Sequence, residues 1–135
     1  RVKTSMYEGM EQVMDALKEQ NISMAIVSNK ADDAVKDLAK YYFAKYIDVA
    51  IGEREGISRK PAPDSVYEAM RLLGATKENT VYVGDSDVDR ATAKNAGIPC
   101  ISVTWGFRSE ELLVSLEPEY LIHKPEEILS VVTGK

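Results

Sequence analysis

Cysteine is almost absent from this sequence. The 135 residues include a single cysteine, Cys100, which excludes an internal disulfide and agrees with a reducing compartment. Cys100 follows Pro99 inside the apolar run CISVTW, so we expect a buried and unreactive thiol. His123 is the only histidine. It falls on a late predicted strand, remote from the polar clusters described below, and we expect it to have an ordinary structural role.

Long apolar runs and an excess of positive charge are also missing. No run approaches the roughly 18 apolar residues of a membrane span, and the first residues, RVKTSMYEG, have no apolar signal-peptide core. The 17 basic and 22 acidic residues give a net charge of −5, with both signs interspersed along the chain. This balance argues against nucleic acid or an anionic membrane as a partner. We therefore expect a cytoplasmic protein.

The composition suits one ordinary globular domain over residues 1–135, because 44% of the residues are hydrophobic and 29% are charged. Helical and extended patterns alternate along the chain, and a strand such as ISMAIVSN is apolar at nearly every position, as in a parallel sheet that is buried on both faces. The predicted strands are 22–29, 49–52, 80–85, 100–105 and 120–124, and the predicted helices are 8–20, 32–43, 64–73, 87–96, 109–116 and 125–132. This alternation predicts a doubly wound, mostly parallel α/β sheet with helices on both faces.

A cluster of aspartates marks the end of one predicted strand. In TVYVGDSDVD, Asp85, Asp87 and Asp89 occupy alternate positions, where ligands collect outside the carboxyl ends of parallel strands. Asp85 and Asp89 are four residues apart, so both carboxylates can face one point above the sheet, and oxygen ligands of this kind suit Mg²⁺. We predict Asp85 as the direct metal ligand and Asp89 as its support. Asp87 is either solvated or a helix cap.

Helix capping and a calcium-binding loop both account for the aspartate cluster less well than a Mg²⁺ site does. Capping accounts for one aspartate or two, but it does not explain Gly84 before them at the tip of an apolar strand. A calcium-binding EF-hand loop would need glycine where the chain has Arg90 and glutamate where it has Ala96. The Mg²⁺ interpretation is therefore preferred.

Three further residues could bind an anion at the same edge of the sheet. Ser28 and Asn29 end a predicted strand and offer a hydroxyl and a backbone N–H. Lys60 lies in SRKPAPD, where the prolines stiffen the chain after it, and its ammonium could neutralise a phosphate as a point charge. Considered without the other residues, Lys60 would be interpreted as a solvated loop lysine and Ser28 as a turn residue.

Taken in order, these stretches resemble the haloacid dehalogenase superfamily, and within it the phosphoglycolate phosphatase-like branch. AIVSN is similar to the second motif, RKPAP to the third and VGDSDVD to the fourth. The resemblance implies a Rossmann-like core and a Mg²⁺-dependent phosphatase that hydrolyses a small phosphorylated metabolite, such as 2-phosphoglycolate, through an aspartyl-phosphate. It implies that Ser28 and Lys60 bind the transferring phosphoryl group and that Asp85 and Asp89 serve Mg²⁺.

One part of the family pattern is not found in this sequence. The first motif, DxDxT, supplies the nucleophilic aspartate, and nothing in the 135 residues matches it; the chain resembles the part that follows the family's helical cap. We therefore expect the first strand and cap to lie in an amino-terminal segment of the parent protein, the sheet to be incomplete at its centre, and this chain alone to be inactive. The identity of the substrate stays open, because the cap selects it.

Two alternatives remain. A receiver-like module also gathers acidic residues, a hydroxyl and a lysine around Mg²⁺, although it would place its acidic pair earlier in the chain. A non-catalytic relative could use the same surface to bind a partner. A phosphatase assay of the intact parent separates this second alternative from an enzyme.

Overall fold

The computed structural model describes residues 9–42, 45–106 and 108–133. Within these residues the chain is an α/β protein in which every strand pair is parallel. The strands are β1 (Ala25–Ala31), β2 (Val49–Glu53), β3 (Tyr82–Gly84), β4 (Cys100–Val103) and β5 (Tyr120–Ile122). The predicted fold class is confirmed.

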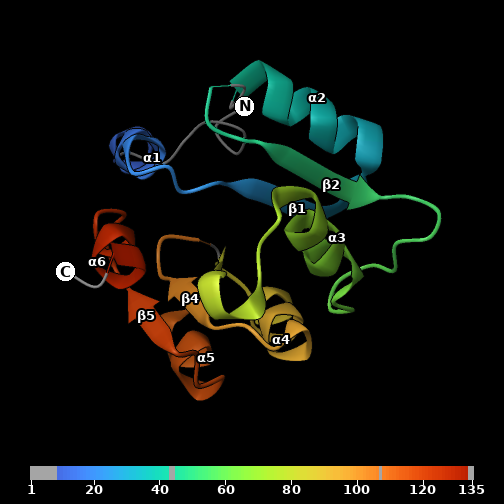
Figure 1. The fold of residues 1–135 in the computed structure, drawn as a ribbon. Coiled ribbons are helices and arrows are strands. Elements are labelled where there is room, and N and C mark those ends of the chain that lie inside the picture. The colour runs from blue at the N-terminus through green and yellow to red at the C-terminus, as the bar shows by residue number, and fades with distance from the viewer. Residues whose placement is uncertain (1–8, 43–44, 107, 134–135) are drawn as a thin grey trace.

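The described strands form two separate sheets. One sheet has the order β1-β2, in which Ile26 pairs with Ala50, and the other has the order β3-β4-β5. In the described residues no ladder of backbone hydrogen bonds joins β1 to β3, although the same chain forms both sheets (Figure 1). The gap expected at the centre of the sheet would lie at this break, and it stays a prediction.

The helices follow the predicted ones closely. They are α1 (Met10–Glu19), α2 (Asp32–Tyr42), α3 (Asp64–Leu73), α4 (Asp87–Ala96), α5 (Glu110–Ser115) and α6 (Glu127–Thr133). The predicted glycine terminator of α3 is confirmed, since Gly74 has φ 69° and its amide donates to the carbonyl of Arg71. A short 3₁₀ turn, Lys77–Asn79, is not among the predicted elements. Residues 8 and 43, at the ends of two predicted helices, lie outside the described residues.

Two apolar clusters form the core. The first lies between α3, α4, β3 and β4, and it contains Val66, Met70, Tyr82, Ala93, Ala96, Ile98 and Cys100. The second lies where α1 and α6 meet beside β4 and β5 (Figure 1), and it contains Val13, Leu17, Ile101, Val103, Ile122 and Ile128. Both clusters pack against β4, whose residues are all buried, so β4 is the most enclosed strand of the described sheets.

The prediction that residues 22–29 form a strand buried on both faces is wrong in two respects. The strand β1 begins at Ala25 and continues to Ala31, so Ser28 and Asn29 lie within it. Its residues are half-buried or exposed, and none is fully buried. The physical reason is its position, because β2 is its only partner among the described strands and no described strand pairs with its other edge.

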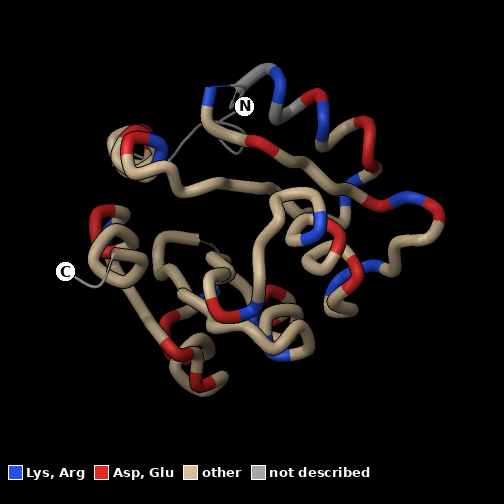
Figure 2. Tube along the Cα trace, viewed as in Figure 1, with Lys and Arg blue, Asp and Glu red and all other residues tan. Residues whose placement is uncertain are grey.

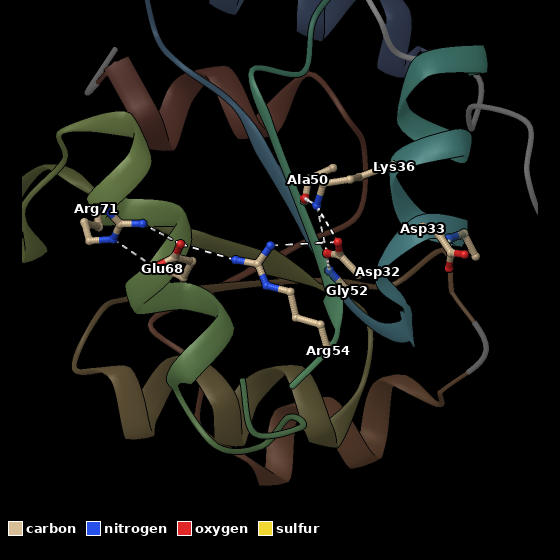
Figure 3. Close-up of polar contacts among 9 residues, drawn as sticks. Asp32, Asp33, Lys36, Ala50, Gly52, Arg54, Glu68 and Arg71 are labelled. Carbon is tan, nitrogen blue, oxygen red and sulfur yellow. Dashed lines mark hydrogen bonds and ion pairs between the residues drawn. The ribbon is translucent and has the colours of Figure 1, made fainter. Parts of the chain in front are cut away.

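A network of ion pairs ties α2, β2 and α3 together (Figure 3). Asp32, the first residue of α2, accepts from the Gly52 amide at 2.9 Å and pairs with Lys36 at 2.8 Å. Arg54 lies between two carboxylates, 3.8 Å from Asp32 and 3.3 Å from Glu68 of α3. The network therefore anchors both flanking helices to the end of β2.

Charges of both signs are distributed over the chain trace, and the described residues show no continuous basic stripe (Figure 2). No helix in the described ranges combines the length and the apolar character needed to cross a membrane. Cys100 is buried, as predicted, with 0% exposure, and burial raises the pKa of its thiol. His123 directly follows β5 and lies 3.2 Å from Glu110 on the surface.

Candidate active site

Lys60, Tyr82 and Asp89 meet in a closed triangle of polar atoms. The Lys60 ammonium donates to Asp89 Oδ1 and to the Tyr82 hydroxyl oxygen, both at 2.9 Å. The Tyr82 hydroxyl in turn donates to the same Asp89 oxygen at 2.8 Å. The Lys60 and Asp89 side chains are only 13% and 12% exposed, so this ion pair is largely shielded from water.

The second oxygen of Asp89 is bound by the residues just before it. Asp89 Oδ2 accepts from the Asp85 amide and from the Ser86 hydroxyl, both at 3.0 Å. Ser86 is also the N-cap of α4, because its hydroxyl accepts from the Asp89 amide at 3.1 Å. A side chain at Gly84 would overlap Asp89, so only glycine allows this close approach. Each Asp89 oxygen accepts two hydrogen bonds, which suits the predicted role of Asp89 as the residue that supports Asp85.

Burial opposes ionisation of Asp89, but the Lys60 ammonium and the hydrogen bonds from Lys60, Tyr82 and Ser86 outweigh it. Together they hold the pKa of Asp89 below its ordinary value. Burial, followed by the negative charge of Asp89, raises the pKa of the Tyr82 hydroxyl. Asp89 is therefore a carboxylate and Tyr82 a neutral phenol near pH 7.

Asp85 is half-buried at the end of β3, and its carboxylate is not neutralised in the same way. Burial and then the like charge of Asp89 raise the pKa of Asp85, while Arg108 and Lys60 oppose this effect. Any side chain at Gly106 would overlap the Asp85 carboxylate, so the chain after β4 packs closely over it. A partly desolvated carboxylate beside another carboxylate is stabilised by a hard cation.

The described residues fit Mg²⁺ through one direct ligand. Asp85 offers one hard oxygen ligand, and Asp89 orients the Asp85 backbone. No group of three or more acidic, histidine or cysteine side chains converges on a common point within the described ranges. Asp87 is the first residue of α4, and it pairs with Arg108 at 3.0 Å on the exposed rim. Asp87 is therefore neither the N-cap nor a free, fully solvated carboxylate.

Asn29 connects β1 to the loop that carries Lys60. Its side-chain oxygen accepts from the Lys60 amide at 2.7 Å, and its side-chain nitrogen donates to the Lys60 carbonyl at 3.2 Å. Asn95 of α4 holds the next residue, donating to the Pro61 carbonyl at 2.8 Å. The loop is thus fixed from both sides, by β1 of one sheet and by α4, which packs on the other.

Ser28 lies next to Asn29 on the half-buried part of β1. Its hydroxyl accepts from the Lys30 amide at 3.1 Å, which is a local turn contact of the kind expected for a serine near the end of a strand. The structure therefore brings Asn29, Lys60 and Asp89 into one connected set with Asp85 beside it. Ser28 is connected to this set only because it precedes Asn29 in the chain.

Comparison with known proteins places this arrangement in a family. The sequence model described as haloacid dehalogenase-like hydrolase matches residues 1–103. The chain belongs to the haloacid dehalogenase-like hydrolase family. The family predicted from the second, third and fourth motifs is thus confirmed.

Relatives within the haloacid dehalogenase-like hydrolases carry two kinds of name. Pyrophosphatase PpaX of Halalkalibacterium halodurans is 32% identical over 130 residues, which are 96% of this chain and 60% of the relative. Phosphoglycolate phosphatase of Rhodobacter capsulatus is 35% identical over 109 residues, which are 80% of this chain and 49% of the relative. The crystal structure of a "putative phosphoglycolate phosphatase" from Lactobacillus delbrueckii subsp. bulgaricus superposes with a TM-score of 0.93 at 35% identity, covering 97% of this chain and 55% of that one. The chain spans less than two thirds of the length of these relatives.

Three residues of this haloacid dehalogenase-like site are not among the predicted ones. Ser86 has a sequence signal, since it stands three residues before Asp89 at a helix start in the pattern of a capping box. Gly106 has none, because its close approach to Asp85 depends on how the chain turns after β4. Tyr82 reads as one more apolar strand residue, and only the fold shows that its hydroxyl reaches Lys60.

Proposed function

We propose that this chain forms part of the active site of a Mg²⁺-dependent phosphatase that hydrolyses a small phosphate ester or anhydride. The observation that carries the proposal is the position of Lys60. Its backbone is held by Asn29 and its ammonium by Asp89 and Tyr82, and the Asp85 amide binds the same Asp89 carboxylate. A fixed cation next to a carboxylate that suits a metal is the arrangement that phosphoryl transfer requires.

The reaction we propose is the one that the family resemblance implies. An aspartate outside the described residues attacks phosphorus, the alcohol or phosphate leaving group departs, and water then hydrolyses the aspartyl-phosphate. Lys60 neutralises charge on the phosphoryl oxygens, and the Ser28 hydroxyl and the Asn29 backbone N–H donate to them. Asp85 would hold Mg²⁺, which supplies further neutralisation of the phosphate when bound.

The substrate class is a small phosphorylated metabolite. Two candidates follow from the names of the relatives, which include phosphoglycolate phosphatase and pyrophosphatase. A monoester such as 2-phosphoglycolate and inorganic pyrophosphate both present a terminal phosphoryl group to Lys60. They differ in the leaving group.

A screen of the intact parent protein tests this function. It should include 2-phosphoglycolate, inorganic pyrophosphate and other phosphorylated metabolites, each with Mg²⁺ and with excess chelator. We expect Mg²⁺-dependent phosphate release from at least one compound, with activity lost in the Lys60→Ala variant. A folded parent that releases phosphate from none of them would favour a non-catalytic relative that binds a partner at this surface.

We also propose that an amino-terminal segment of the parent inserts a strand between β1 and β3. The support is that each of these strands has one edge unpaired among the described strands, and that Val83 of β3 is 42% exposed. Unpaired edges of apolar strands are costly and invite pairing. Mixing this chain with that separately produced segment should restore Mg²⁺-dependent hydrolysis, whereas each part alone should be inactive. Full activity of the purified 135-residue chain would contradict the proposal.

A further inference from the structure

Tyr82 is placed so that its packing fixes the position of a polar group. The residue is 7% exposed and belongs to the core cluster formed by α3, α4, β3 and β4. Its ring is held by apolar neighbours, while its hydroxyl emerges between Lys60 and Asp89. Because the ring cannot move without disturbing the core, the hydroxyl oxygen is a fixed point in the site.

The hydrogen bonds around this oxygen have one consistent direction. The phenol has a single proton, which it donates to Asp89 at 2.8 Å, so its oxygen is left to accept from Lys60 at 2.9 Å. The Lys60 ammonium has three N–H donors, and two of them are used, one by Tyr82 and one by Asp89. With two donors fixed in direction, the third has a defined direction too.

Asp89 alone would not give this result. One contact to a carboxylate oxygen neutralises an ammonium but leaves it free to rotate about the remaining bonds of a flexible side chain. The second hydrogen bond, which Lys60 donates to the Tyr82 oxygen, removes this freedom. It comes from the rigid core, whereas Asp89 comes from the first turn of α4.

We propose that Tyr82 is a positioning residue that aims the free N–H of Lys60 at the phosphoryl group of the substrate. This inference rests on the proposed phosphatase function and adds to it a residue that acts through Lys60. Tyr82→Phe retains the buried ring and removes only the hydroxyl. Lys60 and Asp89 then stay paired, but the ammonium loses its second fixed contact.

Kinetics of the intact parent protein give the first test. Tyr82→Phe should lower kcat by roughly tenfold to a hundredfold, the size of loss seen when the hydrogen-bond partner that orients a metal ligand is removed. The loss should depend on Lys60, so that Tyr82→Phe costs less than about twofold when added to Lys60→Ala. Tyr120→Phe, at an exposed tyrosine of β5, is the matched control and should leave kcat unchanged. An equal loss in both Lys60 backgrounds would overturn the inference, because a general loss of packing acts without Lys60.

A second readout does not depend on activity. In ¹H–¹⁵N spectra of the intact protein, a held lysine ammonium gives a distinct signal, because its protons exchange slowly with water. We expect a Lys60 signal, assigned by its absence in Lys60→Arg, that is lost in Tyr82→Phe and kept in Tyr120→Phe. If this pattern is seen in a protein that releases no phosphate from any substrate, the proposed function is wrong while the positioning by Tyr82 holds. A Lys60 signal unchanged by Tyr82→Phe would overturn the inference. If Tyr82→Phe does not fold, Tyr82→Met provides the same comparison.

Discussion

Asn29 binds the backbone of Lys60 with both ends of its side-chain amide, at 2.7 Å to the Lys60 N–H and 3.2 Å to the Lys60 carbonyl. Asn29 belongs to β1 and Lys60 to the loop before α3, while the Lys60 ammonium reaches Asp89 of α4. Lys60 therefore links two sheets that share no strand ladder in the described part of the chain. Substitutions that remove the hydrogen bonds of this link should lower kcat by more than their effect on the free energy of unfolding suggests.

Asn29→Ala tests this link. The substitution leaves the part-buried N–H and carbonyl of Lys60 without their partner, which should cost about 1 to 3 kcal/mol of unfolding free energy. The loop should also place the ammonium less accurately, so we expect kcat of the intact protein to fall by roughly tenfold or more. Denaturant unfolding and steady-state kinetics measure the two effects.

Asn95→Ala is the matched comparison. Asn95 holds the same loop at 2.8 Å through the Pro61 carbonyl rather than through the Lys60 backbone, so we expect a smaller loss of kcat. If Asn95→Ala lowered kcat as much as Asn29→Ala, fixation of the loop in general would explain both results, and the direct link to Lys60 would be refuted.

Lys60→Ala should lower kcat of the intact protein by roughly two to three orders of magnitude, in line with the loss of one preorganised charge contact to the transition state. Ser28→Ala should cost less, because a neutral hydroxyl contributes less than an ammonium to a phosphoryl group. Steady-state kinetics on the preferred substrate measure both variants. Wild-type kcat and KM in both would refute the phosphate site.

Gly84→Ala should damage the site through Asp89. The added methyl group would overlap the Asp89 side chain, and relief of this overlap must shift Asp89 and with it Lys60. Overpacking of this kind costs about 1 to 3 kcal/mol, and we expect activity to fall at least tenfold as well. In Gly56→Ala a positive φ of 87° also causes strain, but nothing lies within 4 Å of the new atom. That variant should lose stability and keep its activity, and an equal loss of activity in both would contradict the role given to Gly84.

The ion-pair network of α2, β2 and α3 should make stability depend on pH in the acid range. Hydrogen bonds from Lys36 and Gly52 lower the pKa of Asp32, and the contact with Arg71 lowers the pKa of Glu68. A depressed pKa in the folded state contributes stability that is present above the unfolded-state pKa and is lost as pH falls through the folded-state pKa. With ordinary values of 3.8 and 4.5, the thermal midpoint should be steady above about pH 5 and fall below it.

Asp32→Asn provides the check on this pH dependence. It removes one of the titrating groups, so its thermal midpoint should be lower than wild type at about pH 7 and should fall less between about pH 5 and pH 3. Asp33→Asn is the control on the same turn of α2, because Asp33 is exposed and accepts only a local bond from the Ala34 amide (Figure 3). The same flattening in both variants would contradict the assignment to the network.

Much of the fold follows from the sequence, because its signals are local. The span of α3 is predicted from helical periodicity and from Gly74 as its end, and α4 follows from the aspartates of its first turn and from Gly97 after it. The burial of β1 is mispredicted for the opposite reason. An apolar run shows that a strand can be covered on both sides, but cover depends on neighbours distant in sequence, and β2 is the only described strand that pairs with β1.

The residues of the candidate site could be predicted from the sequence, but the contacts between them could not. Lys60, Asp85 and Asp89 could be identified from motifs, since each motif is a short stretch of chain. The contact of Tyr82 with Lys60 joins residues 22 positions apart, and the contact of Asn29 with Lys60 joins residues 31 positions apart. Contacts over such separations depend on how the sheets are placed, which no local pattern encodes.

Titration of Mg²⁺ into the intact protein by calorimetry, with wild type and Asp85→Asn compared, tests the central claim most directly. The claim is that the carboxylate at the end of β3 holds the metal of a phosphatase site, with Asp89 in support. Asp85→Asn removes a charged oxygen ligand from a hard cation and should weaken Mg²⁺ binding by at least about tenfold. Asp87→Asn, at the exposed partner of Arg108, should leave the affinity within about twofold of wild type. An unchanged affinity in Asp85→Asn would contradict the account.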